Sequence, residues 1–255
     1  MGLAIVRNER KGMKILVVGA SGATGRLLVE QLLERGQEVR AIVRSPERLP
    51  ENLRNHDRLS VTYACLLDLS DAQIAWHVEG CGAVASCLGH NLTVKGIFGP
   101  PRRLVTDATR RLCTAIKGQS LSRITKFVLM NTTGNRNRDL DEQTSIGERC
   151  VVGLLRTLLP PQRDNEEAAD YLRTKIGKLD DEIEWVAVRP DTLINEDKVT
   201  RYEVHASPVR SPIFNAGKTS RINVAHFMAE LIADDDTWKC WKGQMPVIYN
   251  AASSR

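Results

Sequence analysis

The sequence lacks the features of a membrane, secreted or metal-binding protein. Across its 255 residues, no apolar run approaches the ~20 residues that a membrane-spanning helix needs. The first twelve residues contain neither the apolar region nor the cleavage site of a signal peptide. The six cysteines form no CxxC pair, and the five histidines show no zinc-site spacing. We therefore expect a cytoplasmic protein with reduced thiols, no metal and no membrane partner.

The charge is mildly basic, but it is not concentrated in one segment. Lys and Arg number 36 and Asp and Glu 31, which gives a net charge of +5. A dedicated nucleic-acid binder usually shows a clustered basic stripe, and none is visible, so we expect no nucleic-acid partner. The excess positive charge instead favours a pocket that binds a phosphorylated anion. The apolar content of 42% excludes a disordered chain.

Short apolar runs alternate with amphipathic stretches, which predicts a parallel sheet wound with helices. We expect a Rossmann-like α/β fold, a doubly wound parallel sheet, with the region after Arg189 forming a small C-terminal cap on the substrate side. A single domain spans residues 13–255, and residues 1–12 form an N-terminal arm or leader. The expected strands cover 14–18, 38–43, 59–64, 82–87, 126–130, 184–188 and 245–249. The expected helices cover 26–35, 71–78, 102–117, a stretch after Pro160-Pro161, and 223–233.

A glycine-rich turn of the form G-x-x-G-x-x-G separates the first strand from the first helix. Gly19 permits a tight exit from the strand, Gly22 lets the backbone approach a pyrophosphate, and Gly25 lets the helix pack against the sheet. Backbone N–H groups and the helix dipole then meet the phosphates. The strand–turn–helix context favours a dinucleotide site over a structural turn. The predicted phosphate-binding residues are Gly19, Ser21, Gly22, Ala23, Thr24 and Gly25.

The residue that ends the second strand indicates which dinucleotide is bound. NAD-binding chains place Asp or Glu there to hold the ribose 2′-hydroxyl. This chain has Arg44 instead, with Arg48 about one turn further on. An arginine fork can bind a 2′-phosphate, so the pair favours NADP(H), although two solvated surface arginines are the alternative.

These residues resemble the short-chain dehydrogenase/reductase superfamily. More narrowly, the chain is similar to its atypical, NmrA-like or NAD(P)H-binding branch, which includes biliverdin reductase B/flavin-reductase-like enzymes. The segments that carry the resemblance lie in family order within residues 13–193. They are VVGASGATG (17–25), AIVRSPERL (41–49), LDLSD (67–71), AVASCLG (83–89), KFVLMNTTG (126–134), YLR (171–173) and WVAVRPDTL (185–193).

The resemblance implies further cofactor contacts along the carboxyl ends of the strands. Asp68 and Leu69 would line the adenine pocket, and Cys87, Leu88 and Gly89 would run along the cofactor ribose. Asp68 and Leu69 follow the third expected strand, and Cys87, Leu88 and Gly89 lie at or just after the end of the fourth.

Near the nicotinamide, the resemblance implies that Thr132 and Thr133 occupy the Ser/Thr site after the fifth strand. Pro190, from the Arg189-Pro190 pair, would lie against the nicotinamide end. Asp191 stands where the family usually has Gly, so the resemblance does not define the backbone conformation at this position.

Two registers compete for the Tyr-x-x-x-Lys pair that typical members use for proton donation. Tyr171 and Lys175 have the right spacing and would share a helix face. Counting back from the YLR segment instead places Gln162 and Glu166 at the family's Tyr and Lys positions. Residues 166 and 171 point about 140° apart on a helix, so both sets cannot face the nicotinamide. The candidate catalytic residues are Thr133, Tyr171 and Lys175.

Other polar residues have weaker functional interpretations. His90 lies at the mouth of the expected cleft, although a solvated loop histidine is the alternative. Asp164 and Glu167 follow Pro160-Pro161 and are interpreted as capping groups of that helix. Arg136 and Arg138 could clamp an anionic substrate, or they could be solvated loop residues.

The sequence thus predicts an NADP(H)-binding protein with two possible functions. The leading hypothesis is an NADPH-dependent oxidoreductase that reduces a small or flavin-like acceptor, with the hydride supplied by the cofactor. The alternative is a non-catalytic NADP(H) sensor that acts through a protein partner.

Overall fold

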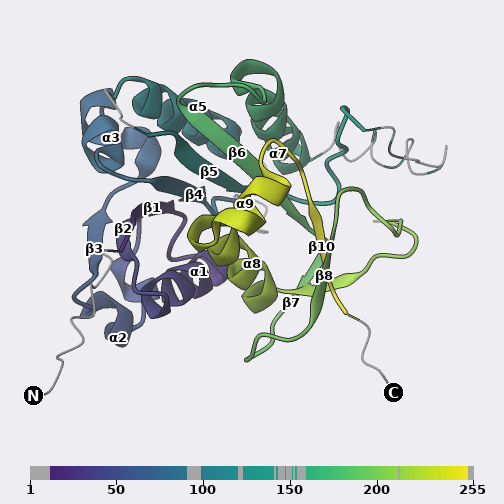
Figure 1. The fold of residues 1–255 in the computed structure, drawn as a ribbon, viewed down its shortest axis with the longest axis horizontal. Helices are drawn as coiled ribbons and strands as arrows, with labels where there is room; N and C mark the ends of the chain where they lie inside the picture. Colours follow the sequence, from purple (N-terminus) through teal and green to yellow (C-terminus); the bar gives the residue numbers. More distant parts are fainter. Residues whose placement is uncertain are drawn as a thin grey trace, which may run out of the picture.

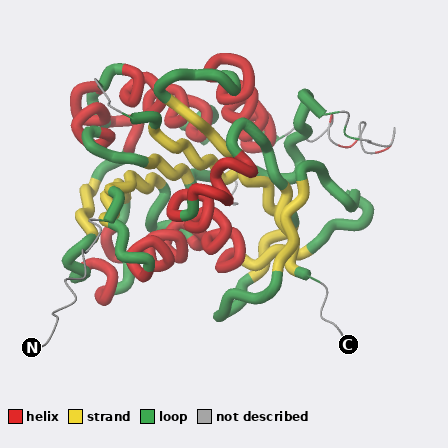
Figure 2. Tube along the Cα trace, in the orientation of Figure 1, coloured by secondary structure: helices red, strands yellow, loops and turns green. Residues whose placement is uncertain are grey.

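The computed structural model describes residues 12–90, 99–119, 123–140, 142, 147, 151, 153, 159–211 and 213–251. These residues form three layers, a central sheet with helices on both faces (Figures 1 and 2). The apolar core is correspondingly divided into two clusters, one on each face of the sheet.

The central sheet has eight strands in the order β3-β2-β1-β4-β5-β6-β10-β8. All neighbours are parallel except β8, which runs antiparallel to β10. The inner strands are continuous apolar runs because helices cover both of their faces. The chain order reverses between β1 and β4, which makes this the topological switch point where such folds bind ligands. The strands are β1 (Lys14–Val18), β2 (Glu38–Val43), β3 (Leu59–Tyr63), β4 (Ala83–Ser86), β5 (Thr125–Met130), β6 (Ile183–Pro190), β8 (Tyr202–His205) and β10 (Val247–Asn250).

The helices divide between the two faces. One face carries α1 (Ala23–Glu34), α2 (Glu51–Arg54), α8 (Arg221–Ala233) and α9 (Asp235–Trp241), and the other carries α3 (Asp71–Val78), α5 (Leu104–Lys117) and α7 (Pro160–Tyr171). Helix α5 forms because Val105, Ala108, Leu112 and Ile116 recur every three or four residues and bury one side against the sheet. Short helical turns follow β2 and β3, namely η1 (Pro46–Arg48) and η2 (Leu66–Asp68), and a π-helical turn, η3 (Leu172–Ile176), extends α7.

The predicted fold class is confirmed, but the last quarter of the chain forms a smaller cap than expected. Strands β10 and β8 extend the central sheet, and α8 packs beside α1 through Val224, Phe227 and Leu231 in the same apolar cluster. Among the described residues, only β7 (Thr192–Ile194) and β9 (Lys218–Ser220) pair as a separate small sheet beyond the end of β6. The difference arises because the apolar residues of α8 and β10 are buried best within the existing layers.

Arg189, at the end of β6, joins three segments through one fully buried side chain. Its guanidinium pairs with the buried Glu142 carboxylate, with Nη2 and Oε1 2.7 Å apart. It also donates to the Asn135 carbonyl at 2.9 Å and to the Met245 carbonyl at 2.7 Å. The side chain therefore fixes the segment after β5 and the approach to β10 against β6.

Replacing Arg189 by Met should lower the free energy of unfolding by about 3–5 kcal/mol, because the Glu142 carboxylate stays buried without its cation. Urea denaturation measures this loss. The matched control is Lys239→Met, which removes an exposed partner of Asp236 and should cause no measurable change. An Arg189→Met protein as stable as the control would contradict this assignment.

Candidate cofactor-binding site

The glycine turn after β1 is built from backbone contacts that leave no room for a Cβ at Gly19 or Gly25. Gly19 has a φ of +75°, and a Cβ there would lie 2.6 Å from the Cys87 carbonyl carbon. A Cβ on Gly25 would lie only 2.2 Å from the Gly19 oxygen. The Gly22 N–H donates to that same Gly19 oxygen at 3.0 Å and closes the turn. The glycines thus let the start of α1 lie directly against the end of β1.

The N-terminus of α1 is open to an anion. Its N-cap residue is Gly22, which provides no side-chain acceptor, and its first turn contains no acidic residue. Helix α5 differs, because the Asp164 carboxylate accepts the N–H groups of Val105 at 2.8 Å and Thr106 at 2.9 Å. The partial positive charge at the start of α1 is therefore available to phosphates, whereas that of α5 is already compensated.

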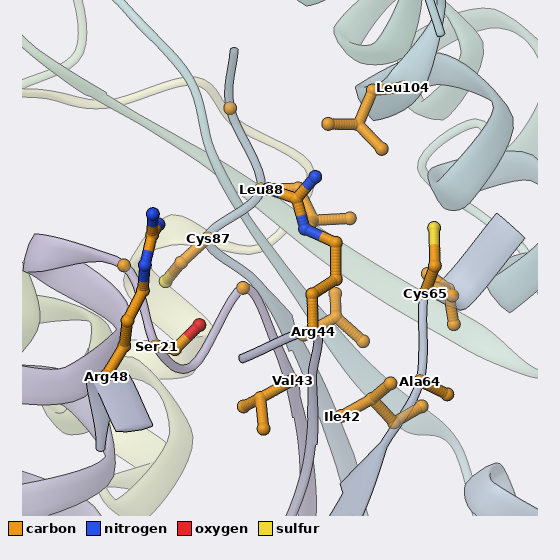
Figure 3. A pocket seen from close by; sticks show the side chains of 15 residues that line it. Ser21, Ile42, Val43, Arg44, Arg48, Ala64, Cys65, Cys87, Leu88 and Leu104 are labelled. Atoms are coloured by element: carbon orange, nitrogen blue, oxygen red, sulfur yellow. The ribbon is translucent and has the colours of Figure 1, made fainter. Parts of the chain in front are cut away.

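A pocket lies directly beyond this turn, at the carboxyl ends of β1 to β4 (Figure 3). Arg44 and Arg48 line it after β2, and Ala64, Cys65 and Leu66 line it after β3. Burial raises the pKa of the Cys87 thiol to about 12, so this part of the wall is uncharged. The lining is Val18, Gly19, Ser21, Gly22, Ile42, Val43, Arg44, Arg48, Ala64, Cys65, Leu66, Cys87, Leu88, Gly89 and Leu104.

The pocket brings together eight of the residues predicted to bind the cofactor, Gly19, Ser21, Gly22, Arg44, Arg48, Cys87, Leu88 and Gly89. Thr24 and Gly25 are buried in the first turn of α1, and Ala23 is exposed at its start. Asp68 and Leu69 lie outside the lining, where Asp68 is exposed and the Leu69 carbonyl accepts from Arg111 at 2.5 Å. Sequence reasoning missed Ala64, Cys65 and Leu66, and their only signal was their place directly after the third strand.

The residues expected near the nicotinamide lie at the ends of β5 and β6. The Thr133 N–H donates to the Pro190 carbonyl at 3.1 Å, and the Asp191 carboxylate accepts the Gly217 N–H at 2.8 Å. Thr132 precedes them, and its hydroxyl oxygen accepts the Gly134 N–H at 3.2 Å. Backbone and side-chain bonds thus hold these segments side by side, as the parallel pairing of β5 and β6 requires.

Gln162 and Glu166 lie beside the segment that follows β5. The Gln162 side-chain amide donates to the Gly134 carbonyl at 2.9 Å and to the Glu166 carboxylate at 3.2 Å. Gln162 therefore contacts the residue that follows Thr133 and holds Glu166 beside it.

Tyr171 and Lys175 lie elsewhere. Tyr171 packs on the flank of α5, where the Arg110 guanidinium lies 5.5 Å from the centre of its ring. Burial, assisted by the Cys113 thiol, raises the pKa of Tyr171, which is opposite to what a proton-donating tyrosine needs. Lys175 is exposed in the π-helical turn. Neither residue lines the pocket.

His90 and Asp164 form a buried pair beside the pocket wall. His90 Nε2 lies 2.8 Å from Asp164 Oδ2, and both side chains are almost inaccessible to solvent. Burial acts to raise the pKa of Asp164, but hydrogen bonds from His90, Thr106 and Val105 outweigh it and lower the pKa. The interpretation of Asp164 as a cap of its own helix is wrong. It lies in the second turn of α7 and caps α5 across the helix–helix contact.

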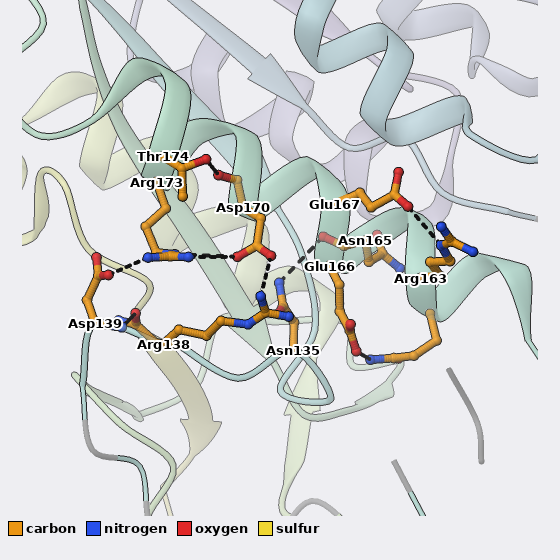
Figure 4. Close-up of polar contacts among 12 residues, drawn as sticks. Asn135, Arg138, Asp139, Arg163, Asn165, Glu166, Glu167, Asp170, Arg173 and Thr174 are labelled. Atoms are coloured by element: carbon orange, nitrogen blue, oxygen red, sulfur yellow. Dashed lines mark hydrogen bonds and ion pairs between the residues drawn. The ribbon is translucent and has the colours of Figure 1, made fainter. Parts of the chain in front are cut away.

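Charge pairs also account for other residues considered as ligands. Glu167, also expected to cap α7, instead pairs with Arg103 at 2.8 Å. Arg138 pairs with Asp170 at 3.1 Å, in a network that continues through Arg173 (Figure 4). The carboxylate of Asp170 on α7 thus compensates the charge of Arg138, so an anionic substrate is not needed to explain this arginine. The side chain of Arg136 is exposed.

Two further observations limit the chemistry of the described part of the chain. Among the described residues, no group of three or more His, Cys, Asp or Glu side chains could hold a metal ion. Within the same residues, none of the helices has the length and apolar character needed to cross a bilayer.

Comparison with known proteins identifies the family. The profile of the NAD(P)H-binding family matches residues 19–235. The chain belongs to this family. The geometry fits its nicotinamide cofactor, because Gly22 presents no side chain at the open end of the turn and α1 begins there without a side-chain cap. A search of curated proteins found no match.

Solved structures share the fold of this NAD(P)H-binding protein at low sequence identity. A short-chain dehydrogenase/reductase from Veillonella parvula DSM 2008, in complex with NADP, is 15% identical with a TM-score of 0.68, covering 95% of this chain and 97% of that one. A candidate NADH-flavin reductase from Streptococcus pneumoniae TIGR4 is 19% identical with a TM-score of 0.64, covering 94% and 100%. A candidate NAD-dependent epimerase/dehydratase from Bacillus halodurans is 21% identical with a TM-score of 0.67, covering 94% and 95%.

Two alanine substitutions should separate the binding and packing roles of the turn. Gly22→Ala should weaken NADPH binding at least tenfold but change stability little, because its Cβ meets only the Gly19 oxygen, at 3.1 Å. Gly25→Ala should lower the free energy of unfolding by about 1–3 kcal/mol, because its Cβ overlaps backbone. Fluorescence titration and urea denaturation measure the two effects. Unchanged NADPH affinity in a stable Gly22→Ala protein would rule out the phosphate-binding role.

Proposed function

We propose that this protein is a cytoplasmic, single-domain NADPH-dependent reductase of a small or flavin-like acceptor. The observation that carries the cofactor assignment is the pair Arg44 and Arg48 in the pocket, opposite the glycine turn. Bound NADPH supplies the hydride, and the protein binds, orients and shields the reacting groups.

The charge of the pocket supports NADPH over NADH. Arg44 replaces the acidic residue that would hold a ribose 2′-hydroxyl. Through their guanidinium groups, Arg44 and Arg48 make no ion pair or hydrogen bond to the described residues. Two unpaired cations facing one pocket suit a 2′-phosphate, which offers a double charge and three acceptor oxygens.

The named activities of similar structures support reductase chemistry. The Veillonella protein is a short-chain dehydrogenase/reductase crystallised with NADP, and the streptococcal protein is a candidate NADH-flavin reductase. A flavin-like acceptor also suits this site because hydride transfer to a flavin needs little acid catalysis, and Tyr171 lies away from the pocket.

A non-catalytic NADP(H) sensor is the second candidate. The positions that resemble the Tyr and Lys of typical members are Gln162 and Glu166. The Gln162 amide donates both to the Glu166 carboxylate and to the Gly134 carbonyl. In this function, NADP(H) binding would favour one conformation and thereby change the affinity for a protein partner.

NADPH should bind at least tenfold more tightly than NADH, and Arg44→Ala should remove most of that preference by deleting a 2′-phosphate contact. Fluorescence titration of both cofactors measures the preference. Arg54→Ala, at an exposed arginine on the neighbouring α2, is the matched control and should keep it. Equal wild-type affinities for NADPH and NADH would reject the NADP assignment.

The wild-type protein should oxidise NADPH in the presence of a quinone, a flavin or an aldehyde. Loss of NADPH absorbance in a stopped assay with each acceptor measures turnover. Tight NADPH binding without turnover by any acceptor would reject the reductase and favour the sensor.

A further inference from the structure

The buried pair of His90 and Asp164 connects two parts of the pocket wall. His90 directly follows Leu88 and Gly89, which line the pocket after β4, and α5 begins at Leu104, which lines it as well (Figure 3). The side chains of His90 and Asp164 are only 4% and 0% exposed, and neither residue lines the pocket itself. An effect of this pair on a ligand must therefore act through the neighbouring residues that line the pocket.

The Asp164 carboxylate binds both parts of the wall at once. Its Oδ2 lies 2.8 Å from His90 Nε2 and accepts the Val105 N–H at 2.8 Å, while its Oδ1 accepts the Thr106 N–H at 2.9 Å. The Thr106 hydroxyl also donates to the main-chain carbonyl of Asp164 at 2.9 Å. One buried side chain thus fixes the residue after Gly89 and the first turn of α5 relative to each other.

The pair is held together because the carboxylate is ionised. Burial acts to raise the pKa of Asp164, but hydrogen bonds from His90, Thr106 and Val105 outweigh it and lower the pKa. An ionised carboxylate only accepts hydrogen bonds, so the proton of the contact with His90 is carried by the histidine Nε2. Separating the two side chains would leave a buried charge short of a donor, which is unfavourable.

Leu88 and Gly89 lie between two fixed points of the chain. On one side, the Cys87 N–H donates to the Val18 carbonyl at 2.9 Å and so continues the pairing of β4 with β1. On the other side, His90 is bound by Asp164. A Cβ on Gly89 would meet no atom of the described residues within 4 Å, so the backbone between these points faces open space. The two anchors therefore define where this part of the wall lies.

We propose that His90 and Asp164 are positioning residues for the cofactor, which hold Leu88 and Gly89 in the place where the pocket admits a dinucleotide. A wall that is already ordered spares the ligand the entropic cost of ordering it, so the pair increases affinity without touching the ligand. This inference rests on the proposed function, because it requires NADPH to bind in this pocket.

NADPH affinity and stability, measured on the same variants, test the proposal. His90→Phe keeps a ring but removes the donor to Asp164, and it should raise the dissociation constant of NADPH roughly two- to tenfold, the effect of ordering one further group on binding. Asp164→Asn should have the same effect. His90→Gln keeps an N–H donor at about the reach of Nε2 and should retain the wild-type affinity. Fluorescence titration measures the affinity, and urea denaturation measures the stability.

A second histidine provides the matched control. His226 on α8 has its Nδ1 2.9 Å from the Tyr202 hydroxyl, and neither of these two residues lines the pocket. His226→Phe therefore removes a comparable hydrogen bond elsewhere, and it should lower stability but leave NADPH affinity unchanged. A loss of stability alone does not alter the affinity of a protein that is folded in the absence of urea. If Asp164→Asn fails to fold, the two His90 variants carry the test.

Three outcomes are decisive. Wild-type affinity for NADPH in a folded His90→Phe protein would overturn the positioning role. An equal loss of affinity in His226→Phe would overturn it as well, because affinity would then follow general stability. If the wild-type protein does not bind NADPH, the proposed function is rejected together with this inference, whereas the first two outcomes leave the proposed function intact.

Discussion

The contact between the first turn of α1 and the end of β1 is the constraint on which the rest of the site depends. Gly25 lies against the Gly19 carbonyl, and Gly19 lies against the backbone of Cys87, at distances that exclude a Cβ. Because no side chain intervenes, the uncapped start of α1 opens at the level where β2, β3 and β4 end. The pocket with its two arginines follows from this close packing.

Buried polar groups elsewhere along this edge are held by several partners each. Arg189 pairs with Glu142, Asp164 caps α5 and accepts from His90, and Asp191 accepts the N–H groups of Thr192 and Gly217. Burying a polar group is unfavourable unless its hydrogen bonds are satisfied, so each of these contacts ties the segments that supply its partners. Side-chain hydrogen bonds and ion pairs therefore stabilise the ends of β5 and β6, where we expect the nicotinamide. The glycine turn after β1, where we expect the phosphates, depends instead on close backbone packing.

The choice between a reductase and a sensor depends on how a proton would reach an acceptor. A carbonyl acceptor needs a proton donor, and Tyr171 packs on α5 with its hydroxyl pKa raised. Thr133, the other candidate donor, is buried and lies outside the pocket lining. These contacts are best suited to an acceptor such as a flavin, whose reduction depends mainly on how closely it approaches the nicotinamide.

The sequence alone determined the features that depend on neighbouring residues. Strand β2 and helix α3 have the bounds that periodicity predicts, and the glycine turn and Arg44, which the sequence singled out, line one pocket. Tertiary structure decided which distant segments meet. Asp164 caps a helix that begins 60 residues earlier in the chain, at Leu104, Ala64–Leu66 replace Asp68 and Leu69 in the pocket lining, and α8 joins α1. Local patterns reveal which face of an element is apolar, but the partner of that face is set by packing across the whole chain.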